Sequence, residues 1–370
     1  MSCFHVGLKK VVDDSYDVQI GSHLFGTMIQ DIKNGLAGER KKFAVITDSH
    51  VEPLYGKPIL CALKEAGYQG DLFVFPAGEK SKVRRTKEEL EDAMLAKGYR
   101  RDCCVIAVGG GVVTDLAGFL AGTFGRGVPF INYATTLLAA ADASIGGKTA
   151  VDTELATNLI GLIYQPLKVY VDINTWKTLP SRHLVNGLAE TVKHACLADP
   201  ELFCYLENHS EDILACEPEA CTYISERNCA VKYKVVMKDE REKNLREILN
   251  LGHTVGRAIE TVSEYRLLHG EALAIGMTAQ VNLGCHCGYL TEAECARVTA
   301  LHKKLGLSVT IPDYIDRDAL VRKLYTDKKV RDGKLRFVFQ KGIGDVMTFG
   351  EDIYARPVEE KEIRDILMQM

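Results

Sequence analysis

The stretch CVIAVGGGVVTDLAGFLA, residues 104–121, joins a predicted strand to a predicted helix through three glycines. Its first five residues, Cys104–Val108, form a short apolar run rich in β-branched side chains, which is typical of a buried strand. Three glycines follow directly, and Val112–Ala121 then show a helical pattern that contains Asp115. A strand that passes through a glycine turn into a helix is half of a βαβ unit, from which parallel sheets are built.

Runs of the same kind recur on both sides of this stretch. We predict further strands at Phe43–Thr47, Leu72–Phe75, Pro129–Tyr133 and Lys168–Asp172. Helical patterns, such as Arg85–Lys97, lie between several of them. This alternation of strands and helices predicts an α/β fold with a parallel sheet.

After Pro180 the sequence is dominated by long patterns with a helical period. We predict helices at Leu184–Leu197, Glu219–Lys238, Gly256–Glu264, Glu271–Asn282 and Thr291–Leu305. Two late extended segments, Leu335–Gln340 and Asp345–Phe349, predict a small hairpin. The chain is therefore predicted to contain an α/β domain, residues 1–179, and a mainly helical domain, residues 180–370, with ligands in the crevice between them.

Composition narrows the classes of function. The 370 residues carry a formal net charge of −4, which gives no reason to expect bulk binding to nucleic acid or to an anionic membrane. The first residues, MSCFHVGLKKVVDD, lack the continuous apolar core of a signal peptide, and no apolar run is long enough to span a bilayer. Twelve cysteines without a CxxC pair then favour buried free thiols in a reducing cytoplasm over disulfides or a zinc ribbon.

Polar residues gather where the predicted strands end. GGGVVTD, residues 109–115, has the form of a phosphate cradle, because glycines allow close approach and the helix N-terminus offers unpaired N–H groups. It is not GxGxxG, and a glycine turn that only packs strand on helix remains open. Asp48 can accept ribose hydroxyls or cap a helix, and Glu79 with Lys82 can touch a cofactor or form a solvated turn. Thr135-Thr136 are equally ambiguous.

Two further segments contain charged residues, one among small residues and the other in a helical pattern. In ADASIGGKTAVD, Asp142 and Lys148 lie among small residues that leave room for a ligand, so Lys148 either binds an anion or is simply exposed. In AETVKHA, Glu190, Lys193 and His194 fall on one helix face. That face is either part of a metal site, with Glu190 and His194 as a pair, or a surface row of salt bridges.

The run REILNLGHTVGRAIETVSEYRLLHGE, residues 246–271, adds two histidines beside glycines, His253 and His269. A glutamate with two histidines leaves positions open for substrate oxygens, as a catalytic zinc ion requires. Arg246 adds positive charge to the same run, as Lys232 does to the same domain. This run is therefore predicted to supply two metal ligands and part of an anion-binding wall.

Seven motifs resemble, in the same order, those of the 3-dehydroquinate synthase family, which belongs to the sugar phosphate cyclases. They are GGGVVTDLAGFLAGTFGRG, TTLLA, DASIGGKTAVD, LAETVKHA, KDEREKNLREILNLGHT, LLHGEALAIGM and DKKVRDGKLRFVF. The resemblance covers roughly residues 42 to 350. It implies a homodimer with a Rossmann-like NAD-binding domain followed by a helical metal and substrate domain, which hold NAD and one divalent metal ion, zinc or cobalt.

The resemblance also implies a reaction, the conversion of 3-deoxy-D-arabino-heptulosonate 7-phosphate to 3-dehydroquinate and phosphate. NAD takes a hydride from a ring carbinol whose oxygen the metal polarises, and the resulting ketone allows phosphate to leave by elimination. The hydride is then returned, the ring opens, and an aldol closure forms the carbocycle. The implied partner is a small sugar phosphate, with neither nucleic acid nor membrane.

Site residues follow from the matched motifs. The implied metal ligands are Glu190, His253 and His269. The implied cofactor positions are Asp48, Glu79, Lys82, Gly110, Gly111, Val112, Val113, Asp115, Thr135, Thr136, Lys148, Thr178 and Leu179. The implied catalytic and substrate positions are Asp142, Lys148, Asn158, Lys193, Lys232, Arg246, Asn250 and Arg257. The phosphate set adds Arg126, which can act across the dimer, with Lys328 or Lys329.

Two positions depart from the family pattern. The family reads GHTxGH where this chain reads GHTVGR, so Arg257 replaces a histidine associated with catalysis. A guanidinium cannot act as a general base. Because it is positively charged, it is unfavourable near a metal cation unless an anion lies between the two. Thr157 stands where the family has a lysine before Asn158. A cyclase with an altered substrate is therefore the alternative.

Two other classes of protein remain as further alternatives. An NAD-dependent polyol dehydrogenase of the same fold would have no use for the cations Lys148, Lys193, Lys232 and Arg246. A non-catalytic binding relative would not need the metal ligands. Among the cyclases, Arg246 with Asn250 favours 3-dehydroquinate synthase, because relatives that make valiolone-type products usually lack this pair.

Overall fold

The computed structural model describes residues 3–5, 7–8, 11–325 and 334–370. The first half contains β1 (Asp17–Gly21), α1 (Phe25–Lys33), β2 (Lys42–Asp48), α2 (Lys57–Glu65), β3 (Gln69–Phe75), α3 (Arg84–Ala96), β4 (Cys103–Gly109), α4 (Gly111–Thr123), β5 (Phe130–Ala134), β6 (Lys148–Val151), β7 (Ile160–Ile163) and β8 (Lys168–Asp172). The second half contains α5 (Ser181–Ala198), α6 (Pro200–Asn208), α7 (Ser210–Leu214), α8 (Pro218–Lys238), α9 (His253–Val262), α10 (His269–His286), α11 (Glu292–Lys304), α12 (Arg317–Leu324), β9 (Leu335–Val338), β10 (Ala355–Val358) and α13 (Glu360–Gln369). Short turns of helix include η2 (Glu79–Ser81), η4 (Ala139–Ala143) and η6 (Leu245–Asn250).

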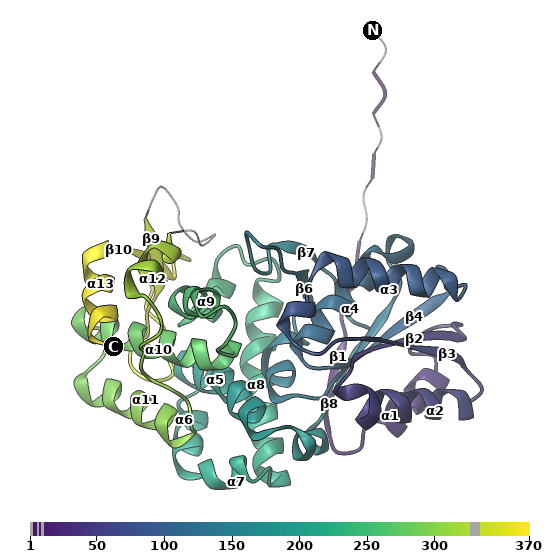
Figure 1. Cartoon of the computed structure of the whole chain (residues 1–370), viewed down its shortest axis with the longest axis horizontal. Coiled ribbons are helices and arrows are strands. Elements are labelled where there is room, and N and C mark those ends of the chain that lie inside the picture. The colour runs from purple at the N-terminus through teal and green to yellow at the C-terminus, as the bar shows by residue number, and fades with distance from the viewer. Residues whose placement is uncertain (1–2, 6, 9–10, 326–333) are drawn as a thin grey trace.

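A parallel six-stranded sheet, in the order β1-β8-β5-β4-β2-β3, forms the centre of the first half (Figure 1). All five strands predicted from the sequence belong to it, and β8 has the predicted bounds. The sequence pattern did not indicate β1, because this short strand, DVQIG, has no fully buried residue and pairs with a distant strand, β8. From β2 the chain continues to β3 on one side, whereas from β4 it continues toward β5 on the other. The strand order therefore reverses between β2 and β4, and ligands of such sheets bind at the carboxyl ends of the strands there.

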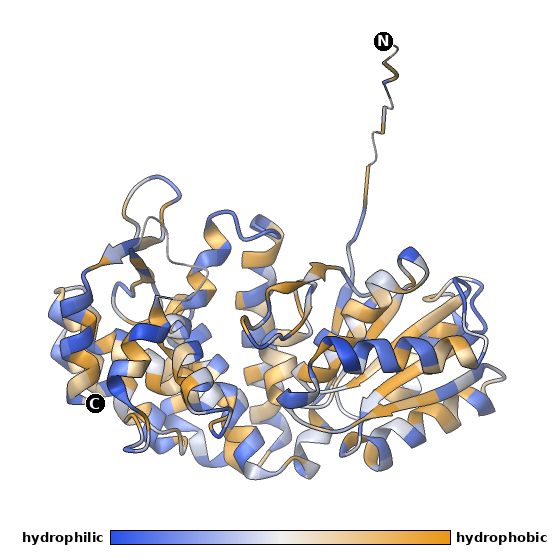
Figure 2. Ribbon diagram, turned by 45° about the horizontal axis from the view of Figure 1, so that its top comes forward, coloured by the Kyte–Doolittle hydropathy of each residue, from blue (hydrophilic) through white to orange (hydrophobic). Residues whose placement is uncertain are grey.

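Apolar side chains cover both faces of this sheet. Phe43 and Val45 of β2 pack with α1 and α2, whereas Ala44 and Ile46 pack with α3 and α4. Successive residues of a strand point to opposite faces, so a strand that is buried on both sides has a continuous apolar sequence. Figure 2 shows the strands mostly orange and the outer faces of the covering helices blue.

The helices of the second half pack in two further clusters. One joins the ends of β5 and β8 to α5, α6, α8, α10 and α11, and the other contains α9, α10, α12 and α13 with β9 and β10. Glycines bring α9 and α10 together: a Cβ atom on Gly276 would lie 2.3 Å from the carbonyl oxygen of Gly252. Gly252 has a φ of +76° and directly precedes α9, so its backbone sets where that helix begins. This contact places His253, the first residue of α9, beside α10.

The predicted hairpin of residues 335–349 forms only at its tip, where the N–H of Met347 donates to the carbonyl oxygen of Phe339 at 2.8 Å and the N–H of Lys341 donates to that of Asp345 at 3.0 Å. β9 pairs antiparallel with β10, not with Asp345–Phe349. That segment makes one isolated bridge, between Val346 and Gln340, and the chain turns again at Gly350 and Ile353 before it returns as β10. The closing strand therefore comes from farther along the chain than the local pattern indicates.

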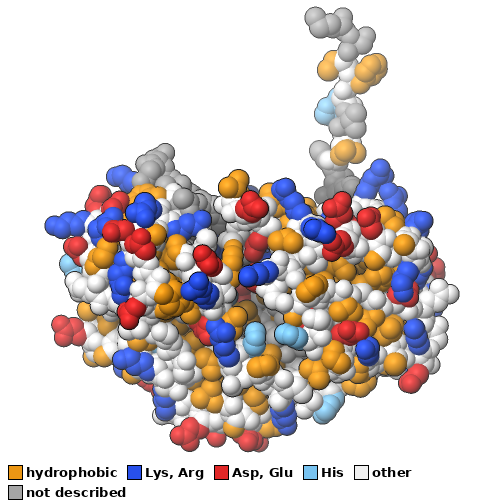
Figure 3. Space-filling view, viewed as in Figure 1, with side chains coloured by type: hydrophobic (Ala, Val, Ile, Leu, Met, Phe, Trp, Pro, Cys, Tyr) orange, Lys and Arg blue, Asp and Glu red, His pale blue; other side chains and the backbone are white. Residues whose placement is uncertain are grey.

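The two halves meet through a shared core. All six strands of the sheet precede Pro180, but Val169 and Val171 of β8 pack in the same cluster as Leu188 and Val192 of α5. The boundary at residues 179 and 180 stays a prediction. Figure 3 shows the surface hollowed between the two halves. Among the residues with described positions, we find no helix with the length and apolar character needed to cross a membrane.

Candidate active site

Three helices bring Glu190 of α5, His253 of α9 and His269 of α10 together. Oε1 of Glu190 lies 3.4 Å from Nε2 of His253 and 3.2 Å from Nε2 of His269. One ligand atom of each residue lies within 4.8 Å of those of the other two. Glu190 is fully buried and His253 nearly so, while His269 is partly exposed. A compact Glu/His/His group of this kind can hold one divalent metal ion and leave positions open for a substrate.

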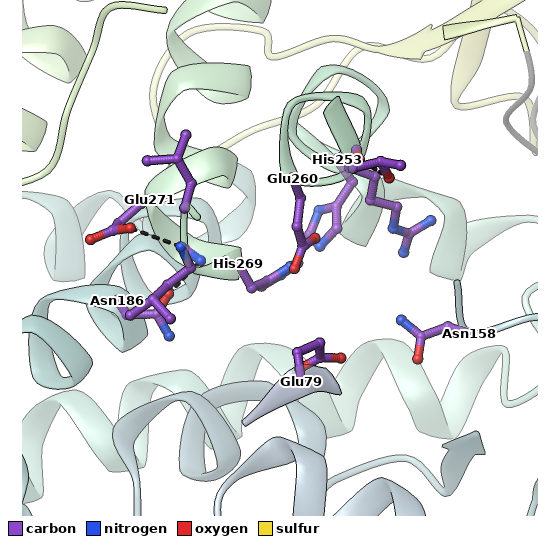
Figure 4. Close-up of polar contacts among 12 residues, drawn as sticks. Glu79, Asn158, Asn186, His253, Glu260, His269 and Glu271 are labelled. Carbon is purple, nitrogen blue, oxygen red and sulfur yellow. Dashed lines mark hydrogen bonds and ion pairs between the residues drawn. The ribbon is translucent and has the colours of Figure 1, made fainter. Parts of the chain in front are cut away.

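The start of α10 fixes the position of His269. The N–H of Gly270 donates to Oδ1 of Asn186 in α5 at 2.6 Å, and Glu271 accepts the N–H of Leu268 at 2.8 Å (Figure 4). A Cβ atom on Gly270 would lie 1.9 Å from the carbonyl oxygen of Asn186. Only glycine therefore allows α10 to begin this close to α5, the helix that carries Glu190.

The second nitrogen of each imidazole has its own partner. Nδ1 of His269 lies 3.3 Å from Oε2 of Glu260, and Nδ1 of His253 lies 3.2 Å from the carbonyl oxygen of Leu251. Such partners orient metal-binding histidines and leave Nε2 as the ligand atom. The donor atoms of this group therefore fit a zinc or cobalt ion.

Burial and the neighbouring charged groups set the protonation of these three side chains before a metal ion binds. Burial lowers the pKa of His253 to about 3, so its ring is neutral. Burial opposes charge on His269 as well, but Glu260 and Glu190 raise the pKa of His269 to about 10. Despite burial, the ammonium group of Lys193 holds the pKa of Glu190 well below its usual value. The proton of His269 thus lies between two carboxylates, where a bound cation would displace it.

Buried cations surround the triad. Lys193 forms an ion pair with Glu190, and both side chains are almost completely buried. Lys232 pairs with the carboxylate of Asp142 and also donates to its carbonyl oxygen at 2.8 Å. His194 is fully buried too, so the alternative of a surface row of salt bridges along AETVKHA is wrong. Charges are buried in this way only when they are paired, which makes the segment part of a site rather than of the solvated surface.

A second polar group lies along η6. Glu242 pairs with Lys148 through one carboxylate oxygen and accepts from the amide of Asn250 at 2.6 Å through the other. Arg246 is 1% exposed and donates to the carbonyl oxygens of Gly146, at 3.0 Å, and Glu240. The structure thus brings the predicted residues Lys148, Arg246 and Asn250 to one wall.

The predicted cofactor residues follow the carboxyl ends of the strands. Gly110 is the N-cap residue of α4. The first backbone hydrogen bond of that helix is donated by the N–H of Thr114 to the carbonyl oxygen of Gly110. The N–H groups of Gly111, Val112 and Val113 therefore have no partner within the helix and can meet a phosphate. This cradle lies beside the reversal of strand order, which fits a dinucleotide.

Lys82 has two close polar partners at the carboxyl edge of the sheet. Its ammonium group lies 2.6 Å from Asp115 and 2.6 Å from Oδ1 of Asn158, and its side chain is buried. Although burial opposes the charge, Asp115 and Glu79 raise the pKa of Lys82. The alternative of a fully solvated turn is therefore wrong for Lys82, while Glu79 stays partly exposed.

The remaining cofactor positions have local partners. Asp48 accepts the N–H groups of His50 and Val51 at 2.8 and 2.9 Å, as a capping residue does. Thr136 accepts the N–H of Ala139, and Thr178 lies 2.6 Å from the hydroxyl of Tyr55. Thr135 is buried directly after the end of β5, and Leu179 follows Thr178. A role of these residues toward NAD stays a prediction.

The cofactor edge faces the metal group. Figure 4 shows His253, Glu260 and His269 on one side, with Glu79 and Asn158 opposite them. A ligand in this space would touch both halves of the molecule at once.

Some predicted residues lie apart from this group. Arg126 is exposed at the end of α4 opposite to Gly111, about 20 Å away for a helix of this length. Lys328 and Lys329 lie outside the described residues. Arg257 shares a face of α9 with His253, is partly buried, and pairs with no carboxylate of the described part of the chain.

Three polar residues were given no role in the sequence prediction. Glu242, in the charge run KDEREK, has the sequence appearance of solvated surface. Glu260 is seven residues after His253 and Asp152 closes the segment with Lys148, but no spacing rule ties either one to the site. Any role of these three residues in the site depends on contacts between segments that are far apart in the sequence.

Comparison with known proteins agrees with this geometry. The family model described as 3-dehydroquinate synthase N-terminal matches residues 72–186, and the one described as 3-dehydroquinate synthase C-terminal matches residues 187–330. A 3-dehydroquinate synthase from Caldanaerobacter subterraneus subsp. tengcongensis is 43% identical over 88% of this chain and 90% of its own.

Two solved structures have a fold similar to that of this chain. The structure of ValA, a 2-epi-5-epi-valiolone synthase from Streptomyces hygroscopicus subsp. jinggangensis with NAD+ and Zn²⁺ bound, has a TM-score of 0.87 at 32% identity and covers 99% of both chains. A 2-deoxy-scyllo-inosose synthase with carbaglucose-6-phosphate, NAD+ and Co²⁺ has a TM-score of 0.86 at 25% identity, covering 95% of this chain and 96% of its own.

Proposed function

The chain belongs to the 3-dehydroquinate synthase family, and from this premise we propose that it converts 3-deoxy-D-arabino-heptulosonate 7-phosphate to 3-dehydroquinate and phosphate. As a phosphate-eliminating cyclase, it would be a carbon–oxygen lyase. The observation that carries the proposal is the buried Glu190–His253–His269 group beside the paired cations Lys193 and Lys232. A small neutral alcohol would give no reason for this concentration of positive charge.

Each part of the site has a task in this reaction. When bound, NAD supplies reversible hydride transfer, and the divalent ion held by Glu190, His253 and His269 polarises the oxygen at the reacting carbon. Lys193 and Lys232 stabilise negative charge on the substrate in a place from which water is excluded. Burial strengthens these interactions, because the dielectric response around the charges is low.

The substrate carboxylate and phosphate need separate binding groups. We assign the carboxylate to Arg246 and Asn250, and the phosphate to Lys148, Asn158 and Arg126. Arg257, whose guanidinium has no carboxylate partner in the described structure, supplies a further cation on the face of His253. It serves as an anion-binding group in this proposal, since it is no proton acceptor.

We further propose that the enzyme is a homodimer in which Arg126 completes the site of the partner subunit. Exposed apolar side chains gather along and before β7: Leu155, Leu159, Leu162 and Ile163 are 91%, 58%, 39% and 38% exposed. Tyr164, directly after β7, donates to the carbonyl oxygen of Val128, so this surface adjoins Arg126. An apolar surface beside a cation that lies far from its own site fits contact with a second copy.

Mixing two inactive variants tests this arrangement. Arg126→Ala and Lys193→Ala damage different parts of the site, so a mixed dimer regains one intact site only if Arg126 acts across the interface. Restored activity after mixing is expected. Its absence, with mixed dimers shown by mass spectrometry, would assign Arg126 to its own subunit or to no site.

A cytoplasmic location is also proposed. The twelve cysteines are free thiols, and Cys103 and Cys104 are buried on β4. Free thiols persist in a reducing compartment.

The reaction itself is tested by one assay. Purified protein with NAD, zinc and the heptulosonate phosphate should release inorganic phosphate without net NADH, because the hydride returns to the substrate. Net NADH with simple polyols and no phosphate release would instead support a dehydrogenase. Release of phosphate from another sugar phosphate only would support a cyclase with an altered substrate.

A further inference from the structure

His194 is the buried residue of the site without a role in the scheme above. It lies on α5 one turn after Glu190 and is fully buried. One of its ring nitrogens lies within 4.8 Å of carboxylate oxygens of both Asp142 and Glu190. These carboxylates belong to two ion pairs, with Lys232 and Lys193 respectively. His194 therefore stands where the two ion pairs meet.

Hydrogen bonds to Asn228 determine which nitrogen of His194 carries the proton. Nδ1 of His194 lies 3.0 Å from Oδ1 of Asn228, whose amide nitrogen donates to Oγ1 of Thr191 at 2.9 Å. The amide thus turns its oxygen to His194, and an amide oxygen only accepts. Nδ1 therefore bears the proton and Nε2 a lone pair. Burial, followed by the charge of Lys193, lowers the pKa of His194 to about 4, so the ring is neutral at pH 7.

The lone pair of His194 needs a donor. Nε2 is buried and has no hydrogen-bond partner among the described residues. The neighbouring carboxylates are no donors when ionised, whereas an ammonium group has three N–H bonds. Lys232 directs two of them at Asp142, and Lys193 directs one at Glu190, so each has at least one more to give.

We propose that Nε2 of His194 accepts a hydrogen bond from one buried water, which in turn accepts from the ammonium group of Lys193 or Lys232 and so positions that lysine for the anionic substrate. His194 is a positioning residue, since it acts on the substrate only through that lysine. The identity of the substrate rests on the proposed function, but the hydrogen bond does not. Groups held in this way keep their geometry while substrate binds and product leaves, which is how supporting residues contribute to rate.

Two variants separate this role from simple packing. His194→Asn retains an amide nitrogen that can bond Asn228 but removes the acceptor at the Nε2 position. His194→Gln retains an acceptor near that position. The matched control is His302→Asn, because His302 is also fully buried with an unpartnered Nε2, yet lies on α11 beside Thr278 rather than beside an ion pair.

The holoenzyme with NAD and zinc is assayed for phosphate release. We expect His194→Asn to lower kcat by about 10- to 100-fold with a smaller change in KM, and His194→Gln to recover part of the loss. His302→Asn should lose stability but keep a kcat close to that of the wild type. An unchanged kcat in His194→Asn, an equal loss in the His302 control, or no advantage of His194→Gln would overturn the proposal.

NMR spectroscopy tests the predicted tautomer of His194 without an activity assay. In protein labelled with ¹⁵N-histidine, the signals of His194 are identified by their loss in His194→Asn. The expected result at pH 7 is a proton on Nδ1 and none on Nε2. A proton on Nε2 would overturn the proposal even in an active enzyme, whereas absence of phosphate release by the wild type, with the expected tautomer, would count against the proposed function alone.

Discussion

Oε2 of Glu260 lies 3.3 Å from Nδ1 of His269, while Nε2 of the same imidazole ring faces Glu190. This contact joins α9 to the first residue of α10 and directs Nε2 of His269 into the metal group. It also places a second carboxylate next to the site, which keeps the imidazole a strong ligand.

Replacement of His269 by alanine should remove the bound metal ion. The change leaves Glu190 and His253, too few protein ligands for a catalytic zinc site. Metal content after dialysis against metal-free buffer, measured by plasma mass spectrometry, should fall to background. His286→Ala, at the exposed end of the same helix, should keep the wild-type stoichiometry. Full metal content in His269→Ala would refute the assigned triad.

Glu260→Gln should weaken metal binding without abolishing it. An amide in place of the carboxylate still bonds Nδ1 of His269 but no longer adds negative charge, so affinity should fall by about 10- to 100-fold. Competition with a chromophoric chelator measures this directly. Glu264→Gln, exposed just beyond the end of α9, is the control and should match the wild type. Equal affinities in both variants would mean that Glu260 does not act on the ion.

Arg257→His should keep or raise cyclase activity. The histidine restores a group that can accept a proton one turn after His253, at the loss of one cation. Phosphate release at several pH values, together with thermal unfolding, measures the effect. A collapse of activity in a stably folded variant would show that the guanidinium of Arg257 has its own task at the site.

Gly270→Ala should destabilise the fold by about 1–3 kcal/mol or more, because the added methyl group meets the backbone of Asn186 at 1.9 Å. Urea unfolding gives the free energy, and metal content shows whether His269 has shifted. Gly26→Ala is the matched control, since a Cβ atom there has no neighbour within 4 Å, and it should be neutral or slightly stabilising. Comparable losses in both variants would contradict the argument from close contact.

Stability should depend on pH through Asp152. Burial raises the pKa of Asp152 to about 6, with Lys82 opposing the shift and Glu79 and Glu260 adding to it. Since the pKa in the folded protein exceeds that of the unfolded chain, the contribution of Asp152 to stability is present below about pH 4 and is lost as the pH rises through 6. Asp152→Asn removes this titration. Relative to the wild type, the variant should therefore gain about 1–3 kcal/mol between pH 4 and pH 7, and a difference independent of pH would contradict the shift.

Local sequence patterns predicted the elements that are buried on both sides or along one long face. β2 and β4 are continuous apolar runs because both of their faces meet helices, and α8 shows its period over twenty-one residues. β1 and β10 escaped prediction, since a short edge strand acquires its partner only from a distant segment.

The order of most strands and helices and the residue types of the site, including Glu190, His253 and His269, could be predicted from local sequence patterns and matched motifs. The convergence of these three side chains, the burial of Lys193 and His194 with them, and the contacts of Glu242 with Asn250 and of Glu260 with His269 became visible in the folded molecule alone. The physical reason is that ligand distances are set by packing between helices, such as the approach of Gly270 to Asn186. Those contacts join residues far apart in the chain, where no local periodicity records them.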